Sequence, residues 1–598
     1  PGTGRRRGAV QQDMQRNTNT TLRRTAAMAA VSAIVLAGCG GGSDDDIADR
    51  ETTDAAADSG TDRGRAGDLE IEYSDRTDEP AEQPVGEPAD EPGARDEPGA
   101  RDEPAADDAG GSAFDAESIE RAAQTTADGG LFDEPDQPEA TPSARDEDNV
   151  FAHYGYRDFV ETRDDPLSTF ALDVDTGSYT VGRRWLDEGR LPPIESVRPE
   201  EYVNAFRYDY DEPRSGLELS VDGGPSPFDD DNHLVRIGVQ GEVVADDERG
   251  PAALTFVVDT SGSMDRDDRL ELVKDSLAIL LDELDDDDTV AIVTYDDASG
   301  VVLHPTPSSD RDVIIDAIDD LRPRGSTNLE AGLRTGYDLA REAFRDDGIN
   351  RVVLASDGVA NVGTTDPDDL VRMIRDDADR GIDLVTVGFG MGNFNDVTME
   401  QLADQGDGFY AYVDTDDEAE RLFEDELTAT LLTIAEDAKI QVEFDPEVVE
   451  EYRLIGFENR GVRDRDFRND DVDAGELGAG HQATAIYEIE LERGVDPSDR
   501  REIGEVFLRW QDPTDGEVVE IDEDIDLRDI EPVWSATTAD FQLATVVATY
   551  AELMRDNPHA VRVDIDDLAH EADRLADEIG DRDVDELADL IERAADLY

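Results

Sequence analysis

The stretch LTFVVDTSGSM, residues 254–264, decides the fold of the central part of this chain. Residues 254–258 are apolar except for Thr255, as a buried parallel strand requires, and a polar turn containing Asp259 follows at once. Strand and helix patterns then alternate as far as residue 413, which predicts an α/β fold with a doubly wound, mostly parallel sheet. Such sheets bind ligands in the crevice beyond the carboxyl ends of their strands, where Asp259 is expected.

Polar residues in two later turns complete a pattern with this stretch. Asp259, Ser261 and Ser263, followed by Thr327 and Asp357, resemble the metal-ion-dependent adhesion site of von Willebrand factor type A domains, whose sheet is Rossmann-like. The resemblance implies that these five side chains hold one cation. Oxygen ligands from three loops suit Mg²⁺, and Mn²⁺ or Ca²⁺ fits the same ligand types. The resemblance also implies that the ion binds a Glu or Asp carboxylate of a protein partner.

Other interpretations of these residues stay open. Asp259, Ser261 and Ser263 are a weak signal by themselves, because a serine-rich turn after a strand can simply cap the next helix. A degenerate, metal-free site would make the protein a structural scaffold of an envelope complex. The enzymatic alternative is a metal-dependent hydrolase. Because the chain has no phosphate-binding loop with a following lysine, no His-Glu-x-x-His and no Gly-x-Ser-x-Gly, we expect a binding protein without catalytic residues.

The flanks of the central block extend the resemblance. Residues 165–179 resemble the domain that precedes the type A domain in a family of bacterial lipoproteins, and residues 452–460 resemble the domain of unknown function that follows it. We therefore predict three domains: a smaller N-terminal α+β domain over 149–245, the type A domain over 246–437, and a C-terminal domain over 438–598 with strands to about residue 532 and helices after it.

Three polar residues of the flanks are further candidates for a site. Asp173 and Asp175 are spaced like metal ligands, but two carboxylates on one strand face favour a solvated edge. His481, in a glycine-rich turn, is kept as a weak site candidate beside the simpler interpretation of a turn histidine that hydrogen-bonds the backbone.

The chain carries 54 Lys and Arg residues against 151 Asp and Glu residues, a net charge of −97. This charge excludes a nucleic-acid partner, because phosphates are bound by clustered Lys and Arg. Repulsion of this size destabilises a compact state in dilute buffer and is screened in molar salt, where the Debye length is about 3 Å. We interpret the acidity as adaptation to high salt; the alternative is an acidic surface that only aids solubility.

The N-terminal residues predict export and lipidation. Residues 26–37 are almost all apolar but too few to span about 30 Å of hydrocarbon comfortably, which favours a signal peptide over residues 1–38 that starts at Met14. Leu36-Ala37-Gly38-Cys39 resembles the bacterial lipobox, which implies that a peptidase cuts before Cys39 and that its sulfur carries lipid. The alternatives are a structural cysteine and, from the weakly matching residues 21–25, a twin-arginine signal.

Residues 39–148 predict a lipidated cysteine followed by a disordered tether, because they are rich in Asp, Glu, Ala, Pro and Gly and poor in large apolar residues. Gly40 rather than Asp follows the cysteine, so for a cell with two membranes the resemblance to sorted lipoproteins implies the outer one. We expect attachment to the outer membrane or the cell surface, and attachment facing the periplasm is the alternative. We thus expect a membrane-anchored, extracytoplasmic binding or adhesion protein.

Overall fold

A computed structural model describes residues 141–143 and 149–598, apart from 230–231, 246–248, 347, 359–366, 392–393, 471, 496–499 and 515. The side chains of residues 141–143, 267–268, 367–369 and 425 are also outside the description. These residues belong to one compact unit of the chain, Pro104–Tyr598. The predicted signal peptide, Cys39 and nearly all of the predicted tether lie outside the described residues. None of the described helices combines the length and apolar character needed to cross a membrane.

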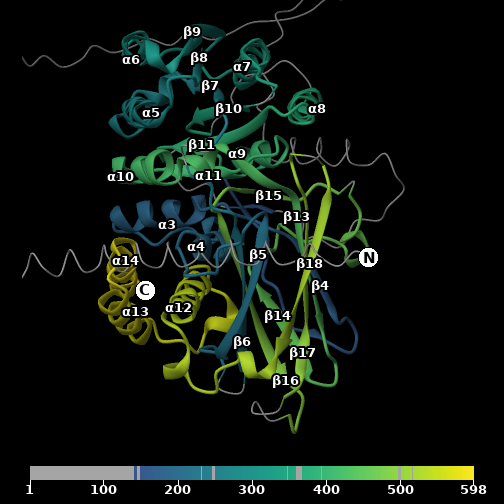
Figure 1. Cartoon of the computed structure of the whole chain (residues 1–598). Coiled ribbons are helices and arrows are strands. Elements are labelled where there is room, and N and C mark those ends of the chain that lie inside the picture. The colour runs from purple at the N-terminus through teal and green to yellow at the C-terminus, as the bar shows by residue number, and fades with distance from the viewer. Residues whose placement is uncertain are drawn as a thin grey trace, which may run out of the picture. The chain divides into compact units, whose positions relative to one another are not determined.

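The central block is built on a six-stranded sheet with the order β12-β11-β10-β7-β8-β9, seen at the top of Figure 1. All neighbouring strands are parallel except β8 and β9, which form an antiparallel edge. The strands are β7 (Ala252–Asp259), β8 (Thr289–Tyr295), β9 (Ser299–Pro307), β10 (Ile349–Ser356), β11 (Asp383–Phe389) and β12 (Tyr410–Val413). The helices are α5 (Leu272–Glu283), α6 (Arg311–Asp319), α7 (Leu329–Ala343), α8 (Pro367–Ala378), α9 (Asp396–Asp404), α10 (Asp416–Glu420) and α11 (Leu427–Leu431).

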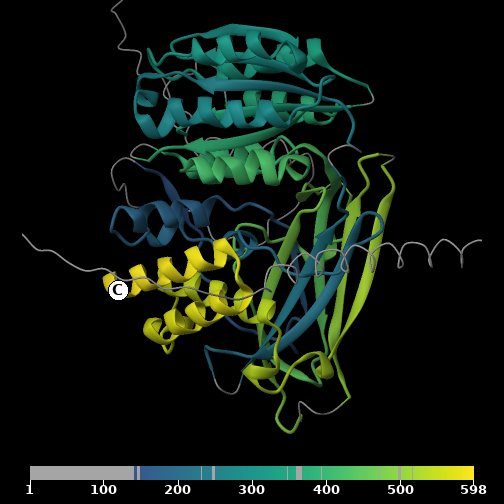
Figure 2. The same ribbon diagram turned by 60° about the vertical axis from the view of Figure 1, so that its left-hand side comes forward.

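Helices cover both faces of this sheet, as Figure 2 shows. Successive residues of β7 point to opposite faces: Val257 packs with residues of α7, α8 and α9, whereas Phe256 and Val258 pack with residues of α5 and α6. Every residue of β7 is buried, which explains its nearly continuous apolar sequence. The predicted doubly wound α/β fold is confirmed.

The two flanks of the central block fold together into paired sheets. β4 (Leu167–Ala171) pairs with β13 (Thr433–Phe444), and β6 (Asn232–Gly241) pairs with β16 (Gln482–Leu491), so each sheet contains strands from both flanks. The first sheet has the order β15-β13-β17-β18 with β4 on β13, and the second has the order β3-β14-β16-β6-β5. The other strands are β3 (Val160–Glu161), β5 (Leu217–Pro225), β14 (Val449–Ile455), β15 (Gly475–Gly478), β17 (Glu502–Gln511) and β18 (Val518–Asp526). The sequence patterns predict the two flanks as separate domains. The pairing between their strands was not predictable, because partners this far apart in the sequence leave no local signal.

The inner faces of both sheets share one apolar core, to which Phe170, Ile237, Val442 and Leu508 contribute. A second core joins five helices from both flanks: α3 (Gly177–Asp187), α4 (Pro199–Asn204), α12 (Ala539–Met554), α13 (Ile565–Ile579) and α14 (Arg582–Leu597). The two short strands β1 (Thr141–Ser143) and β2 (Phe151–His153) form a separate antiparallel pair. The central block is thus inserted between two halves of one β-and-helix assembly.

Acidic residues stand directly opposite one another across three neighbouring strands. Glu505 of β17 pairs with Glu443 of β13 on one side and with Asp524 of β18 on the other. Partial burial and then neighbouring carboxylates, among them Asp524 and Glu443, raise the pKa of Glu505. Like charges in direct cross-strand pairs are destabilising, so this arrangement is expected to require screening by salt.

Replacing Glu505 with glutamine is therefore expected to raise the thermal midpoint by about 1–3 °C in low salt and to have no effect in molar salt. Differential scanning calorimetry in both buffers measures the change, and the wild-type midpoint itself should rise steeply with salt. Glu520→Gln is the matched control, because Glu520 lies on the same strand pair but is bound by Arg468 and Arg509. An equal gain in both buffers, or the same gain in the control, would refute the screening account.

Candidate metal site

Asp259 is the last residue of β7 and is fully buried at the carboxyl edge of the central sheet. Its Oδ1 accepts a hydrogen bond from the backbone N–H of Ser261 at 2.7 Å, and its Oδ2 accepts one from the Ser356 hydroxyl at 3.0 Å. Ser356 ends the neighbouring strand β10. The carboxylate is therefore fixed where two adjacent parallel strands end, the position expected for a ligand site.

The two serines of the first loop present their hydroxyl groups together. The Oγ atoms of Ser261 and Ser263 are 2.8 Å apart. Neighbouring ligands of an octahedral Mg²⁺ at about 2.1 Å from the ion stand about 3 Å from each other. The spacing of the two hydroxyl oxygens therefore fits two positions on one hard cation.

Backbone hydrogen bonds attach the loop that carries Thr327 to this first loop. The N–H of Gly262 donates to the carbonyl of Gly325 at 3.1 Å, and the N–H of Arg324 donates to the carbonyl of Thr260 at 2.6 Å. Thr327 is 2% exposed, and its neighbour Asn328 caps α7. These contacts bring the predicted threonine ligand to the same edge of the sheet.

Asp357 follows β10 and is fully buried beside Arg269. Nη1 of Arg269 donates to Asp357 Oδ2 and, at 2.9 Å, to the carbonyl of Ser263, while Nη2 donates to the carbonyl of Met391 at 2.5 Å. Nothing in the sequence marks Arg269 as part of the site, because an arginine at the start of a helix is usually exposed.

The two buried carboxylates of the site attract a cation, against the opposing charge of Arg269. Burial, and then the nearby charge of Asp357, raise the pKa of Asp259 to about 7, although hydrogen bonds from Ser261 and Ser356 act in the opposite direction. A divalent cation would relieve the repulsion between the two buried carboxylates. Two carboxylates and three hydroxyls also form the oxygen-rich donor set that Mg²⁺ prefers, so the residues present fit the ion.

The structure thus places all five predicted ligands on three adjoining loops at one edge of the sheet, and their role as ligands stays a prediction. A pocket of about 380 Å³, lined by residues 294, 296–300, 324 and 325, opens beside the loop that carries Thr327. The site is therefore bordered by space into which a partner's side chains could extend.

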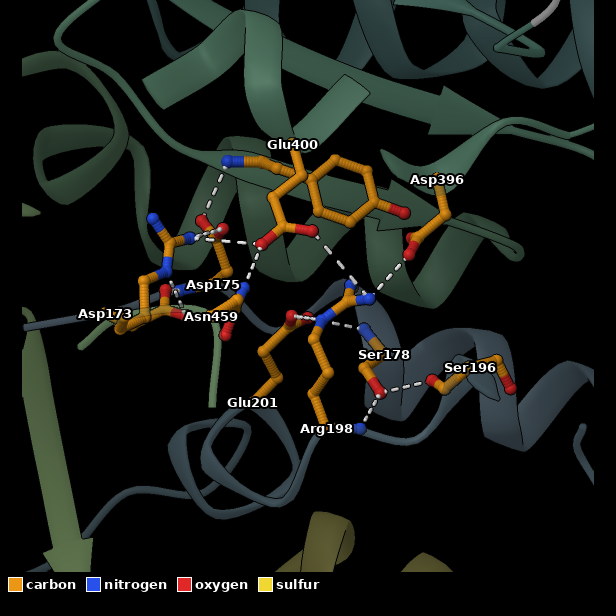
Figure 3. Close-up of polar contacts among 12 residues, drawn as sticks. Asp173, Asp175, Ser178, Ser196, Arg198, Glu201, Asp396, Glu400 and Asn459 are labelled. Carbon is orange, nitrogen blue, oxygen red and sulfur yellow. Dashed lines mark hydrogen bonds and ion pairs between the residues drawn. The ribbon is translucent and has the colours of Figure 1, made fainter. Parts of the chain in front are cut away.

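A second polar centre lies where the flanks meet α9, and Figure 3 shows Arg198 between carboxylates there. Arg198 contacts Glu201 of α4, Asp396 at 2.6 Å and Glu400 at 3.8 Å. Burial is the main cause that raises the pKa of Glu201 to about 8 and that of Glu400 to about 7. This ion-pair network joins the flanking assembly to the central block.

The interpretation of Asp173 and Asp175 as a solvated edge is wrong, because both are buried. Their carboxylates and that of Glu201 lie within 4.8 Å of one another, close enough to share a cation. Arg460, however, donates to Asp173 at 3.2 Å and to Asp175 at 3.1 Å, and Arg198 pairs with Glu201. Ion pairs therefore account for this cluster without a metal.

His481 has the structural role of a turn residue. Its Nδ1 accepts a hydrogen bond from the backbone N–H of Gly478 at 3.1 Å, and its ring contacts Phe409 edge to face. Burial is the main cause that lowers the pKa of His481 to about 4, so the imidazole is neutral at ordinary pH. These contacts favour the interpretation of His481 as a turn histidine that hydrogen-bonds the backbone over a role in a site.

Three family profiles match this chain. The profile described as "von Willebrand factor type A domain" matches residues 253–425, "von Willebrand factor" matches residues 145–236, and "Uncharacterized protein YfbK, C-terminal" matches residues 429–597. The matched ranges together span the described unit from the segment before β2 to the end of α14.

Known proteins resemble the chain to different extents. Uncharacterized protein YfbK of Escherichia coli (strain K12) is 36% identical over 420 residues, which cover 66% of this chain and 72% of YfbK. Inter-alpha-trypsin inhibitor heavy chain H3 of Homo sapiens is 28% identical over 197 residues, 31% of this chain and 22% of that protein. Among solved structures, a von Willebrand factor type A protein from Catenulispora acidiphila aligns with a TM-score of 0.35 and 16% identity over 63% of this chain and 89% of that one.

Proposed function

Because the chain belongs to the bacterial von Willebrand factor type A family that includes YfbK, we propose that it is a binding protein whose central domain recognises a partner carboxylate through a metal ion. The observation that carries the proposal is the convergence of five oxygen-bearing side chains from three loops, with the Ser261 and Ser263 hydroxyls 2.8 Å apart. Asp259, Ser261, Ser263, Thr327 and Asp357 would hold the ion. When bound, the ion supplies a positive charge and an exchangeable position for an anionic oxygen.

The chain's own residues prepare the site in three ways. Ser356 and the Ser261 N–H hold the carboxylate of Asp259 in one orientation. The backbone bonds of Gly262 and Arg324 hold the first two loops together, so the ligands need little rearrangement. The pocket beside Gly325 leaves room for the residues around a partner's Glu or Asp.

The proposal is tested with Mn²⁺ in place of Mg²⁺ and with acetate as a carboxylate probe, because no partner is identified. The protein loaded with Mn²⁺ should bind acetate at the metal, detected as a loss of water-proton relaxation when acetate displaces bound water. Asp259→Ala should abolish both the Mn²⁺ signal and its response to acetate. Metal-dependent phosphoester turnover that disappears in a folded Ser261→Ala variant would favour the hydrolase instead. A folded wild type that binds neither Mg²⁺ nor Mn²⁺ would favour the scaffold.

We also propose that the protein is exported and anchored to the outer membrane or the cell surface through lipid on Cys39. The lipobox-like ending of residues 36–39 and the acidic tether composition that follows support this proposal. Mass spectrometry of protein extracted from the envelope should find a diacylglyceryl-modified Cys39 at the mature N-terminus, and Cys39→Ala should release the protein from membranes. An unmodified Cys39 inside a longer mature chain would refute the anchor.

A further inference from the structure

A buried positive charge contacts one of the predicted metal ligands. Arg269, in the short helical turn Asp267–Glu271 before α5, is fully buried, and its guanidinium donates to Asp357 and to the carbonyls of Ser263 and Met391. Gly390 closes the space on one side: a Cβ added there would lie 2.4 Å from Cγ of Arg269. The guanidinium is therefore held in one place against a predicted metal ligand.

The contact between Arg269 and Asp357 makes the net charge of the site more positive. The two carboxylates of Asp259 and Asp357 alone would neutralise a divalent cation. Because the Arg269 guanidinium contacts one of these carboxylates, the same residues with the ion carry one net positive charge. The nearby Arg266 also points to the Met391 carbonyl, whereas Arg324 is 71% exposed and screened by water.

We propose that Arg269 sets the charge balance of the metal site, weakening cation binding and strengthening the binding of an anionic ligand. The inference rests on the proposed function and deepens it, because it explains why the ligand must be a carboxylate and not a neutral oxygen donor. The guanidinium repels the incoming cation and attracts the incoming anion, and because Arg269 and Asp357 are both fully buried, water screens these effects less than at the surface. Arg269 acts through Asp357 and the ion, so it is a positioning residue.

Two substitutions separate charge from packing. Arg269→Gln removes the charge and keeps hydrogen-bond donors near Asp357, whereas Arg269→Lys keeps the charge and loses the planar fork. Calorimetry should show Mg²⁺ binding about tenfold tighter in Arg269→Gln and within about threefold of wild type in Arg269→Lys. Acetate binding to the Mn²⁺-loaded protein should be about tenfold weaker in Arg269→Gln.

Thermal midpoints measured in Mg²⁺ and in EDTA provide an independent readout. The stabilisation by Mg²⁺ should be larger in Arg269→Gln than in wild type, because the uncompensated Asp357 destabilises only the metal-free protein. A purely structural role would lower both midpoints equally and would weaken Mg²⁺ binding in both variants, which would overturn the inference. If wild type binds no metal, the proposed function fails together with the inference; if wild type binds metal and Arg269→Gln binds it no more tightly, only the inference fails.

Discussion

Replacing Arg198 with methionine is expected to lower the free energy of unfolding by about 3–5 kcal/mol at alkaline pH. The side chain of Arg198 is 5% exposed, and the three carboxylates around it are at most 3% exposed. Methionine fills a similar volume but leaves these buried negative charges with less compensation. Urea unfolding in molar salt measures the loss, because surface repulsion is screened there.

The loss should depend on pH in a defined direction. Burial raises the folded-state pKa of Glu201 to about 8 and of Glu400 to about 7, above their ordinary values, so the folded protein binds protons that the unfolded chain has released. Wild-type stability therefore falls as pH rises from about 4.5, the ordinary pKa of a glutamate, to about 7–8, and levels off above that. Removing Arg198 raises these pKa values further, so the variant should lose most stability near pH 8.5 and approach wild type near about pH 5.5.

The matched control is Arg582→Met. Arg582 also forms an ion pair across the same boundary, with Asp417 of α10 at 3.6 Å, but the two side chains are 69% and 74% exposed. Its loss should change stability little at any pH. The account is contradicted if Arg198→Met lowers the free energy of unfolding no more than Arg582→Met does, or if the loss does not vary with pH. The buried network would then not hold the flanks to the central block.

Most of the central sheet was predictable because its parallel strands carry local signals, whereas no sequence pattern predicted the antiparallel edge strand β9. The apolar run before Asp259 and the helical pattern of residues 270–284 correspond to β7 and α5. The five candidate ligands were predictable for the same reason, since each follows a strand or lies in a turn of recognisable spacing. They lie at one edge of the sheet in the structure, and their role as ligands stays a prediction.

The pairing of the flanks and the buried ion pairs were not predictable. β4 and β13 meet only because the central block is inserted between them, and no periodicity records a partner so distant in sequence. Asp173 and Asp175 look exposed in a strand pattern because their partner, Arg460, is supplied by the other flank. The burial of Arg269 was not predictable because it depends on Asp357 and Met391, which lie in the loops after β10 and β11.

Asp259→Ala is expected to abolish metal binding and leave the fold intact. The substitution removes one of the two buried carboxylates, whose pKa is raised to about 7 by burial and then by the nearby charge of Asp357. The metal-free variant should therefore be at least as stable as wild type, unlike a variant that disrupts the core. Glu283→Ala, at the exposed end of α5, is the control that removes the same charge away from the metal-site loops.

The most direct test is a calorimetric titration of Mg²⁺ into wild type, Asp259→Ala and Glu283→Ala in molar salt. The account predicts one site per chain in wild type and in Glu283→Ala, and no binding in Asp259→Ala at an unchanged or higher thermal midpoint. Equal Mg²⁺ binding by wild type and Asp259→Ala, or no binding by folded wild type, would contradict the assignment of this edge of the sheet as a metal site.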